Sequence, residues 1–343
     1  MIVALDTQLA VGTATGAGVY QRDLARALRS AGVDVRALQA PHLDPWRFDR
    51  RVLWDQLLLP LAAARSGAHV LHASAGTMPA LRTLPTVVTV HDLAWLRVQS
   101  HTRPYARFYF GTFQRTLYRG ASAIVCDSMF SASEYRELVD PGAHVDVVYP
   151  GVDARFAAIE RDPDRDEPLA LVVGTVERRK NLGILIEALP SVPNLTIVSV
   201  GPFTPYADEI RARAAELNVA DRVDLRGYVD AADLDRLYAR ATCALVPSRY
   251  EGFGYALAEA MCAGLPAIAA RSSSLIEVAN SAAPLLDPDD RVAWADAMRA
   301  LLADPDRAER HAGDVRAASV ARFAWDACAR AVVAVYERVA RRA

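Results

Sequence analysis

The sequence PSRYEGFGYALAEAMCAG, residues 247–264, decides the fold. An apolar run at residues 243–246 precedes it and reads as a buried strand, while the apolar side chains of residues 255–262 repeat with helical spacing. A strand, a glycine-bearing turn and a helix in this order are typical of a parallel α/β unit. The turn carries Glu251 and the helix carries Glu259.

The two glutamates lie eight residues apart, which corresponds to about 12 Å along a helix. This is too far for the cooperating carboxylates of a glycosidase, which lie about 5–9.5 Å apart. The first helical turn lies between them, and its free N–H groups favour a phosphate. The pattern predicts a nucleoside diphosphate sugar, with its sugar at Glu251, its diphosphate near Gly254 and Tyr255, and its ribose at Glu259.

Short apolar runs alternate with helical patterns along the whole chain, so we expect two doubly wound α/β domains of the Rossmann-like kind, facing each other across a cleft. The predicted strands are residues 2–5, 33–38, 70–72, 86–90, 123–126, 145–148, 169–173, 195–200, 223–225, 243–246 and 267–270. The predicted helices include residues 19–29, 103–119, 130–139, 181–189, 206–217, 232–239 and 255–262.

A charged, proline-bearing run at residues 161–168 separates residues 1–160 from residues 169–324 and reads as a linker. Its alternating aspartates imitate a metal-binding loop, but no glycine turn or distal glutamate completes a calcium site. Residues 325–343 form a last helix with an apolar stripe. We expect this helix to pack back on the N-terminal domain.

Composition restricts the class of protein. The chain has 343 residues, 52% of them apolar, with a net charge of −2 and four scattered cysteines. A net charge this close to zero does not favour binding to nucleic acid. The scattered cysteines are typical of a protein in a reducing compartment, without disulfides. His69 and His72 lack a third ligand for zinc. With no signal-peptide pattern at the start, we expect a cytoplasmic protein without a metal site.

The segment GTVERRKN, residues 174–181, follows the first strand of the second domain. Arg179 and Lys180 directly precede a helix for which Asn181 is a predicted N-cap. Two cations beside free N–H groups could hold a diphosphate. A pair of surface cations is the alternative interpretation.

In the first domain, Gly16 and Gly18 open the first helix and would allow a ligand to approach the backbone. His91 follows a strong strand and could donate a hydrogen bond to a sugar hydroxyl, although a structural histidine is the alternative. Residues 103–119 combine aromatic residues and arginines. This helix could face the core, or meet an acceptor or a membrane that carries one.

Together these segments resemble the retaining glycosyltransferases of family 4, which have the GT-B fold. The resemblance covers almost the whole chain and rests on these motifs: TGAGVYQRDLARAL, TVVTVHDLAW, IVCDSMFSASE, VVYPGVD, VGTVERRKN, GYVDAADLDRLYARA, PSRYEGFGYALAEAMCAGLP and SSSLIEV. The pair Glu251 and Glu259 matches the family's two glutamates. Ala256 and Ile276 stand where the family commonly has proline, which affects loop geometry more than charge.

The resemblance implies a role for each candidate residue. The donor would bind the second domain and the acceptor the first. Donor contacts would come from the following residues: Arg179 and Lys180 at the diphosphate, Glu251 with the backbone of Phe253 and Gly254 at the sugar, Tyr255 at the helix N-terminus, and Glu259 at the ribose. The first-domain matches are Gly16 and Gly18, at the loop that meets the diphosphate and acceptor, and His91, near the donor sugar. No cofactor or divalent metal would be required.

The expected function is therefore a retaining hexosyltransferase that moves a sugar from a nucleotide diphosphate sugar to a hydroxyl of a growing glycan or lipid-linked saccharide. Relatives with similar motifs often use GDP-mannose, which favours a GDP-sugar over a UDP-sugar. We expect no nucleic-acid partner, and leave open a peripheral contact with the inner membrane face and the oligomeric state. The alternatives are a nucleotide-sugar epimerase of similar fold and a non-catalytic nucleotide-sugar-binding subunit.

Overall fold

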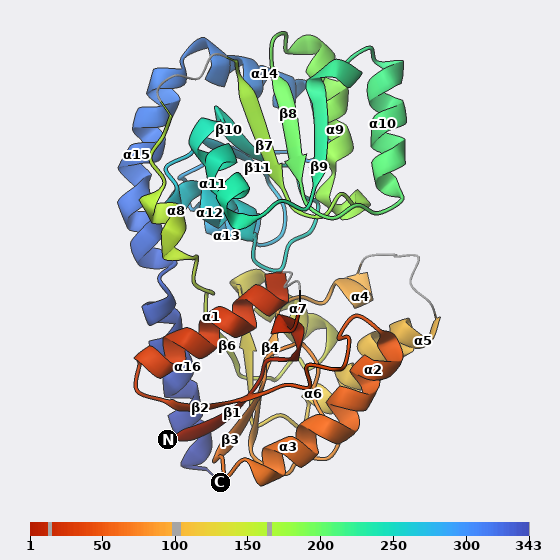
Figure 1. The fold of residues 1–343 in the computed structure, drawn as a ribbon, viewed down its shortest axis with the longest axis vertical. Coiled ribbons are helices and arrows are strands. Elements are labelled where there is room, and N and C mark those ends of the chain that lie inside the picture. Colours follow the sequence, from red (N-terminus) through yellow and green to blue (C-terminus); the bar gives the residue numbers. More distant parts are fainter. Residues whose placement is uncertain (13–15, 98–103, 163–166, 343) are drawn as a thin grey trace. The chain divides into compact units, whose positions relative to one another are not determined.

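A computed structural model describes residues 1–12, 16–97, 104–162 and 167–342 (Figure 1). The contacts divide the chain into two compact units: unit 1 is Met1–Gly151 with Phe323–Ala343, and unit 2 is Val152–Arg322. The boundary predicted after residue 160 lies further along the chain than this division. Residues 163–166 of the predicted linker lie outside the described residues.

Unit 1 is built on a six-stranded parallel sheet with the order β2-β1-β3-β4-β5-β6. Its strands are β1 (Ile2–Asp6), β2 (Asp34–Leu38), β3 (Val70–Ala73), β4 (Thr86–Val90), β5 (Ala123–Cys126) and β6 (Val145–Val147). Its helices are α1 (Gly16–Ser30), α2 (Phe48–Leu53), α3 (Leu59–Arg65), α4 (Ala94–Arg97), α5 (Pro104–Arg107), α6 (Gln114–Tyr118), α7 (Met129–Leu138) and α16 (Trp325–Ala340).

Alternating side chains of β1 show how the sheet of unit 1 is covered on both faces. Val3 and Leu5 belong to a core shared with α1 and α16, whereas Ala4 belongs to a core shared with α3. The apolar stripe of α16 (Cys328, Val332, Val335, Tyr336 and Val339) is buried in the first of these cores. The last helix of the chain is thus part of the core of unit 1, beside α1 (Figure 1).

The helix predicted at residues 103–119 is interrupted. In the described part, α5 passes through a π-helical turn, η3 (Phe108–Phe113), into α6. A second π-helical turn, η2 (Trp54–Leu58), joins α2 to α3. The hydroxyl of Tyr109 in η3 donates to the carboxylate of Asp55 at 2.9 Å and accepts from Gln56 of η2 at 2.9 Å. The two irregular turns therefore face each other through buried polar contacts.

Unit 2 also has a six-stranded parallel sheet, with the order β12-β11-β10-β7-β8-β9. Its strands are β7 (Leu169–Val173), β8 (Thr196–Val200), β9 (Val223–Gly227), β10 (Cys243–Val246), β11 (Ala267–Ala270) and β12 (Leu285–Leu286). Its helices are α8 (Ala154–Ala158), α9 (Leu182–Ala188), α10 (Tyr206–Glu216), α11 (Ala231–Arg240), α12 (Tyr255–Cys262), α13 (Leu275–Ala279), α14 (Arg291–Ala303) and α15 (Pro305–Arg322).

The strand order of unit 2 reverses at β7, which pairs with β8 on one side and with β10 on the other. Ligands of open α/β sheets bind beyond the carboxyl ends of the strands at such a switch point. The loops that follow β7 and β10 are therefore neighbours, although about seventy residues separate them in the sequence.

Candidate functional site

The loops after β7 and β10 bring together the charged residues that the sequence predicted at a donor. Nζ of Lys180 donates to Oε1 of Glu251 at 2.6 Å, and Nη1 of Arg179 donates to Oε2 at 3.2 Å. The same Nη1 donates to the carbonyl of Tyr250 at 3.0 Å. A buried carboxylate thus lies between two half-buried cations at the switch point.

The charges fix the ionisation of Glu251. Burial alone would raise its pKa, but the ammonium of Lys180 and the guanidinium of Arg179 outweigh burial and lower the pKa below 4.5. Glu251 is therefore a carboxylate at neutral pH. An ionised carboxylate accepts hydrogen bonds only, which suits sugar hydroxyl donors.

Two serines that were not among the predicted site residues support the turn that carries Glu251. The backbone N–H of Glu251 donates to the hydroxyl of Ser273 at 2.9 Å. The hydroxyl of Ser274, which is buried, shares its one proton between the carbonyls of Glu251 and Phe253, at 2.9 and 2.8 Å. Both serines belong to the quoted motif SSSLIEV, so a sequence signal for them existed.

Asn181 occupies the N-cap position of α9, as predicted, but its side chain makes no capping hydrogen bond. It occupies the position before the helix with a left-handed backbone (φ 58°), and its amide donates instead to the carbonyls of Pro247 and Pro288 at 3.1 and 2.8 Å. Its role is to tie the loop after β7 to the loop after β10, which keeps Lys180 beside Glu251.

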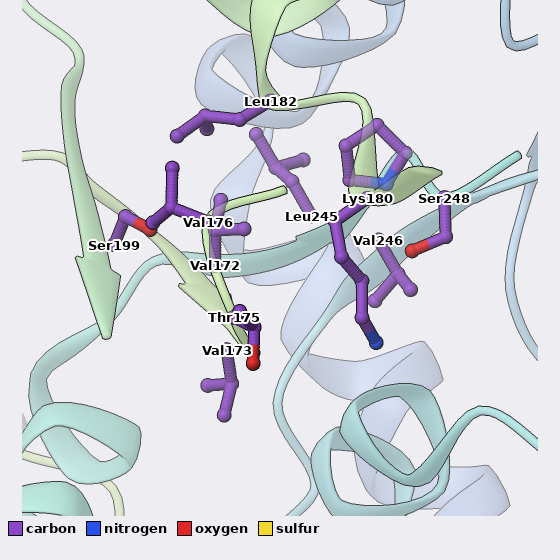
Figure 2. A pocket seen from close by; sticks show the side chains of 12 residues that line it. Val172, Val173, Thr175, Val176, Lys180, Leu182, Ser199, Leu245, Val246 and Ser248 are labelled. Carbon is purple, nitrogen blue, oxygen red and sulfur yellow. The ribbon is translucent and has the colours of Figure 1, made fainter. Parts of the chain in front are cut away.

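A pocket lies at the carboxyl ends of β7, β8 and β10 (Figure 2). Its volume is about 300 Å³ when the adjoining open solvent is included. Its wall is mostly apolar, and Lys180, Thr175 and Ser248 supply polar groups. Gly174 has a φ of 136°, and a β-carbon there would lie 3.3 Å from Cε of Lys180. The lysine side chain therefore runs close along the backbone of this loop.

Helix α12 begins at Tyr255, as the sequence predicted, and Gly254 precedes it with a φ of 99°. A side chain at Gly254 would be strained and would approach Cδ2 of Leu275 to 2.6 Å. Phe253 is buried, and its ring meets that of Tyr255 edge-on at 5.2 Å. The glycine thus allows the chain to turn from Glu251 into the helix that carries Glu259.

Glu259 is half-buried and accepts a hydrogen bond of 3.0 Å from the hydroxyl of Tyr238, a fully buried residue of α11. Burial raises the pKa of Glu259 to about 7, against the opposing effects of Tyr238, Arg155 and Lys180. The protonation of Glu259 therefore changes near neutral pH. Tyr238 was not predicted, although it lies in the quoted motif GYVDAADLDRLYARA, because the motif does not indicate which residue its hydroxyl contacts.

The remaining predicted residues lie in unit 1. Gly16 is exposed at the start of α1 and Gly18 is buried in its first turn, whereas Thr15, in the same motif, lies outside the described residues. His91 directly follows β4 and contacts Tyr20 of α1, with ring centroids 4.8 Å apart. The first-domain residues thus share one neighbourhood, at the carboxyl ends of the strands of unit 1.

Neither metal ligands nor membrane spans stand out in the described residues. They contain no group of three or more His, Cys, Asp or Glu side chains arranged to hold a metal ion. Within the same residues, no helix combines the length and apolar character that crossing a bilayer requires.

Comparison with known proteins gives two family matches that adjoin along the chain. Residues 14–156 match the model described as Glycosyltransferase Family 4, and residues 156–316 match the model described as Glycosyl transferases group 1. Each match corresponds to most of one unit.

Curated relatives carry several specificities. A D-inositol 3-phosphate glycosyltransferase of Xylanimonas cellulosilytica is 37% identical over 60% of this chain and 52% of its own length, so the match spans about half of that relative. An alpha-maltose-1-phosphate synthase of Mycobacterium tuberculosis is 27% identical over 94% of this chain and 95% of its own length. An O-antigen chain mannosyltransferase B of Escherichia coli is 28% identical over 73% of this chain and 70% of its own length.

Solved structures show that the fold is GT-B. A sucrose-phosphate synthase from Thermosynechococcus elongatus has a TM-score of 0.81 and 23% identity, and each chain is fully covered. The Anabaena protein HepE, solved in complex with UDP and glucose, has a TM-score of 0.75 and 17% identity, with 98% of this chain and 100% of that chain covered.

Proposed function

Because this chain belongs to the group 1 and family 4 glycosyltransferases, we propose that it transfers a hexose from a nucleotide diphosphate sugar to a hydroxyl of a growing glycan or lipid-linked saccharide. One observation carries the proposal: Lys180 and Arg179 converge on the buried Glu251 carboxylate at the switch point of unit 2. This arrangement offers positive charge to a diphosphate and an acceptor of hydrogen bonds to a sugar, side by side.

The donor would lie along the residues in a fixed order. Glu251 and the backbone around Phe253 would bind the sugar hydroxyls, and Glu259 would bind the ribose. An ammonium has three N–H donors, of which Glu251 engages one of those on Lys180. Lys180 can therefore bind a phosphate oxygen without releasing Glu251. The first turn of α12, beginning at Tyr255, would add its positive dipole end.

The reaction would keep the anomeric configuration. A bond would form between the acceptor oxygen and the anomeric carbon on the face from which the diphosphate leaves, while the bond from that carbon to the diphosphate breaks. The acceptor proton would pass to the leaving phosphate oxygen, so that a nucleoside diphosphate is released. Arg179 and Lys180 would stabilise the charge on the leaving group, and no divalent metal would be required.

We favour GDP-mannose as the donor over UDP-sugars. The support is the family resemblance of the motifs and the relative named a mannosyltransferase. The HepE complexes with UDP make a UDP-sugar the competing choice. A thermal-shift series with GDP, UDP and ADP, each with its sugars, decides between them, because a ligand at 100 times its Kd adds about 2.7 kcal/mol of stability.

Turnover then tests the reaction class. The purified chain, given GDP-mannose and an acceptor glycan, should release GDP and form an α-linked product, and chelation of divalent cations should leave the rate unchanged. Isomerised nucleotide sugar without acceptor would identify an epimerase. Saturable binding with no turnover on any acceptor would identify a binding subunit.

We also propose that unit 1 contacts anionic lipid at the inner membrane face. The helical stretch at residues 48–65 exposes Leu53, Leu57 and Leu61 at successive turns, with 39%, 57% and 47% of their surface accessible. A second helical stretch, residues 104–118, exposes Phe108. It packs against the stretch at residues 48–65, where the rings of Phe48 and Tyr105 have their centroids 4.5 Å apart.

Charge favours lipid over another protein as the occupant of this surface. Arg65, Arg107 and Arg115 are exposed on the two stretches, whereas Asp49 is the one exposed acid among their described residues and pairs with Arg47. Apolar side chains beside arginines suit an anionic interface. Leu57→Asp should reduce sedimentation with phosphatidylglycerol vesicles. The control Val292→Asp, at an equally exposed residue of unit 2, should not. Equal sedimentation of the wild type with phosphatidylcholine and phosphatidylglycerol vesicles would reject the lipid contact.

A further inference from the structure

His91 and Asp127 form a pair that follows from the sheet of unit 1. Val90 of β4 lies opposite Cys126 of β5 in the parallel register. The next residue of each strand is therefore brought to the same edge, and these residues are His91 and Asp127. Nδ1 of His91 lies 2.6 Å from Oδ2 of Asp127, which is buried.

The other ring nitrogen of His91 is also engaged. Nε2 lies 3.0 Å from the carbonyl oxygen of Ser74, the residue that follows β3. A carboxylate and a backbone carbonyl can only accept hydrogen bonds, so each ring nitrogen has to carry a proton to satisfy both contacts. A neutral imidazole has a proton on only one ring nitrogen. The other nitrogen would then face an oxygen that can only accept, either that of Asp127 or that of Ser74. The geometry thus favours the imidazolium.

From this geometry we propose that Asp127 is a positioning residue that holds His91 as a fixed imidazolium at the carboxyl ends of the strands of unit 1. The inference rests on the proposed transferase function and deepens it. With both N–H groups committed, His91 serves the reaction through its positive charge. It does not act as a proton acceptor, and donation of an N–H to a sugar hydroxyl would require it to release Asp127 or Ser74.

Among the described residues, the charged groups that raise the pKa of His91 are the carboxylates of Asp127 and Asp92. Burial lowers the pKa of His91, but Asp127 and the Ser74 carbonyl outweigh burial, so the pKa is raised above 6.5, with Asp92 adding to the effect. Three titratable groups on neighbouring elements are neutral, because burial lowers the pKa of His72 of β3 to about 3, keeps Tyr20 of α1 protonated, and raises the pKa of Cys328 of α16 to about 12.

The carboxylate depends on His91 in return. Oδ1 of Asp127 is buried and has no hydrogen-bond partner among the described residues. A buried carboxylate that lacks full hydrogen bonding is stabilised mainly by an adjacent positive charge. Loss of the charge on His91 would therefore leave a buried carboxylate without its charged partner.

The test is a nitrogen-detected NMR titration of the histidine-labelled full chain. In the wild type, both ring nitrogens of His91 should remain protonated above pH 6.5. Asp127→Asn keeps the shape and removes the charge, so it should lower the pKa of His91 below the wild-type value. Asp34→Asn, an exposed carboxylate of the same unit paired with Arg36, should leave it unchanged.

In turnover, Asp127→Asn should lower kcat with little change in KM for the donor, and the pH at which kcat falls should move down. Asp127→Glu, which restores the charge, should recover part of kcat. A wild-type His91 that is neutral at pH 6.5 overturns the proposal, and the wild-type spectrum gives this result even if a variant does not fold. Absence of transfer from any nucleotide sugar, with His91 still protonated, would reject the transferase function and leave the Asp127–His91 pairing intact.

Discussion

Nζ of Lys180 and Oε1 of Glu251 lie 2.6 Å apart although 71 residues separate them in the sequence. The pairing of β7 with β10 makes the two loops neighbours. Of the 39 lysine and arginine residues, Lys180 is the only lysine. A lysine is a compact point charge, whereas an arginine is a broad planar fork. The close backbone of Gly174 explains why the compact cation fits this position.

Lys180→Ala should lower the rate of transfer by about 10²–10³-fold, the usual effect of removing one donor to a developing negative charge. It should also raise the pKa of Glu251, because Lys180 is the strongest of the groups that lower it. Lys180→Arg is the matched control, which keeps the charge and changes the shape. We expect it to retain nucleotide binding and lose most transfer, as measured by calorimetry and steady-state kinetics. If Lys180→Ala turned over at the wild-type rate, Lys180 would not stabilise the leaving diphosphate.

Nucleotide binding should release a proton near neutral pH. Glu259 would have to be ionised to accept from the ribose hydroxyls, and its pKa in the free protein is raised to about 7. Affinity should therefore rise between pH 6 and pH 8, and calorimetry in buffers of different ionisation enthalpy should detect the proton. Tyr238→Phe removes a hydrogen bond that lowers this pKa, so it should weaken binding more at pH 7 than at pH 8.5. Affinity that does not vary with pH would place the ribose elsewhere.

The same carboxyl links stability to pH. The folded state holds its proton more tightly than the unfolded state, whose pKa is near 4.5. This contribution is fully present below pH 4.5 and is lost as the pH rises through about 7. Glu259→Gln should therefore raise Tm relative to the wild type more at pH 8 than at pH 5. An equal change of Tm at the two pH values would show that the carboxyl is not perturbed.

The fully buried His72 should make the free energy of unfolding depend on pH in the opposite direction. It contacts Tyr336 at 2.6 Å and Thr89 at 2.7 Å, and burial lowers its pKa to about 3. The unfolded state binds a proton near pH 6.5, so stability is lost as the pH falls from 6.5 toward 3, by about 1.4 kcal/mol per unit. In urea titrations His72→Gln should flatten this dependence, whereas His144→Gln, at an exposed residue, should not. If the stability of His72→Gln varied with pH as steeply as that of the wild type, other groups would be responsible for the loss of stability in acid.

Gly201 should tolerate no side chain. Its φ is 147°, and a β-carbon would lie 2.2 Å from the carbonyl oxygen of Gly174 in the loop that carries Lys180. Gly201→Ala should destabilise unit 2 by about 1–3 kcal/mol, the range for a forced backbone conformation. Gly313→Ala, in α15 with open space around it, should stabilise by about 0.5–1 kcal/mol. Equal unfolding midpoints of the two variants would contradict this assignment.

Much of the fold was predictable because the strands of covered parallel sheets are apolar throughout. Strands β5, β7 and β10 and helix α12 begin and end at the predicted residues. Strand β12 has only two residues, too few to give a period. The helical stretch at residues 48–65 was missed because Pro60 and a π-helical turn interrupt its pattern.

The charged residues of the candidate site were predictable from their place after strands, but their partners were not. The contact of Glu251 with Lys180 depends on the order of the strands, which no local pattern encodes. Asp127 was predictable, because it directly follows β5 just as His91 directly follows β4. Tyr238 meets Glu259 only through the packing of α11 on the sheet, and this contact requires the structure.

Since Lys180 is the only lysine, its reaction with acetic anhydride tests the donor site most directly. Mass spectrometry would follow acetylation of this single ε-amine with and without GDP-mannose, at nucleotide concentrations that saturate the thermal shift, and the N-terminal amine would serve as the internal reference. Donor bound at Lys180 and Glu251 should slow the modification of Lys180 and leave the reference unchanged. An unchanged rate at Lys180 under saturating donor would contradict the central claim that these residues hold the activated sugar.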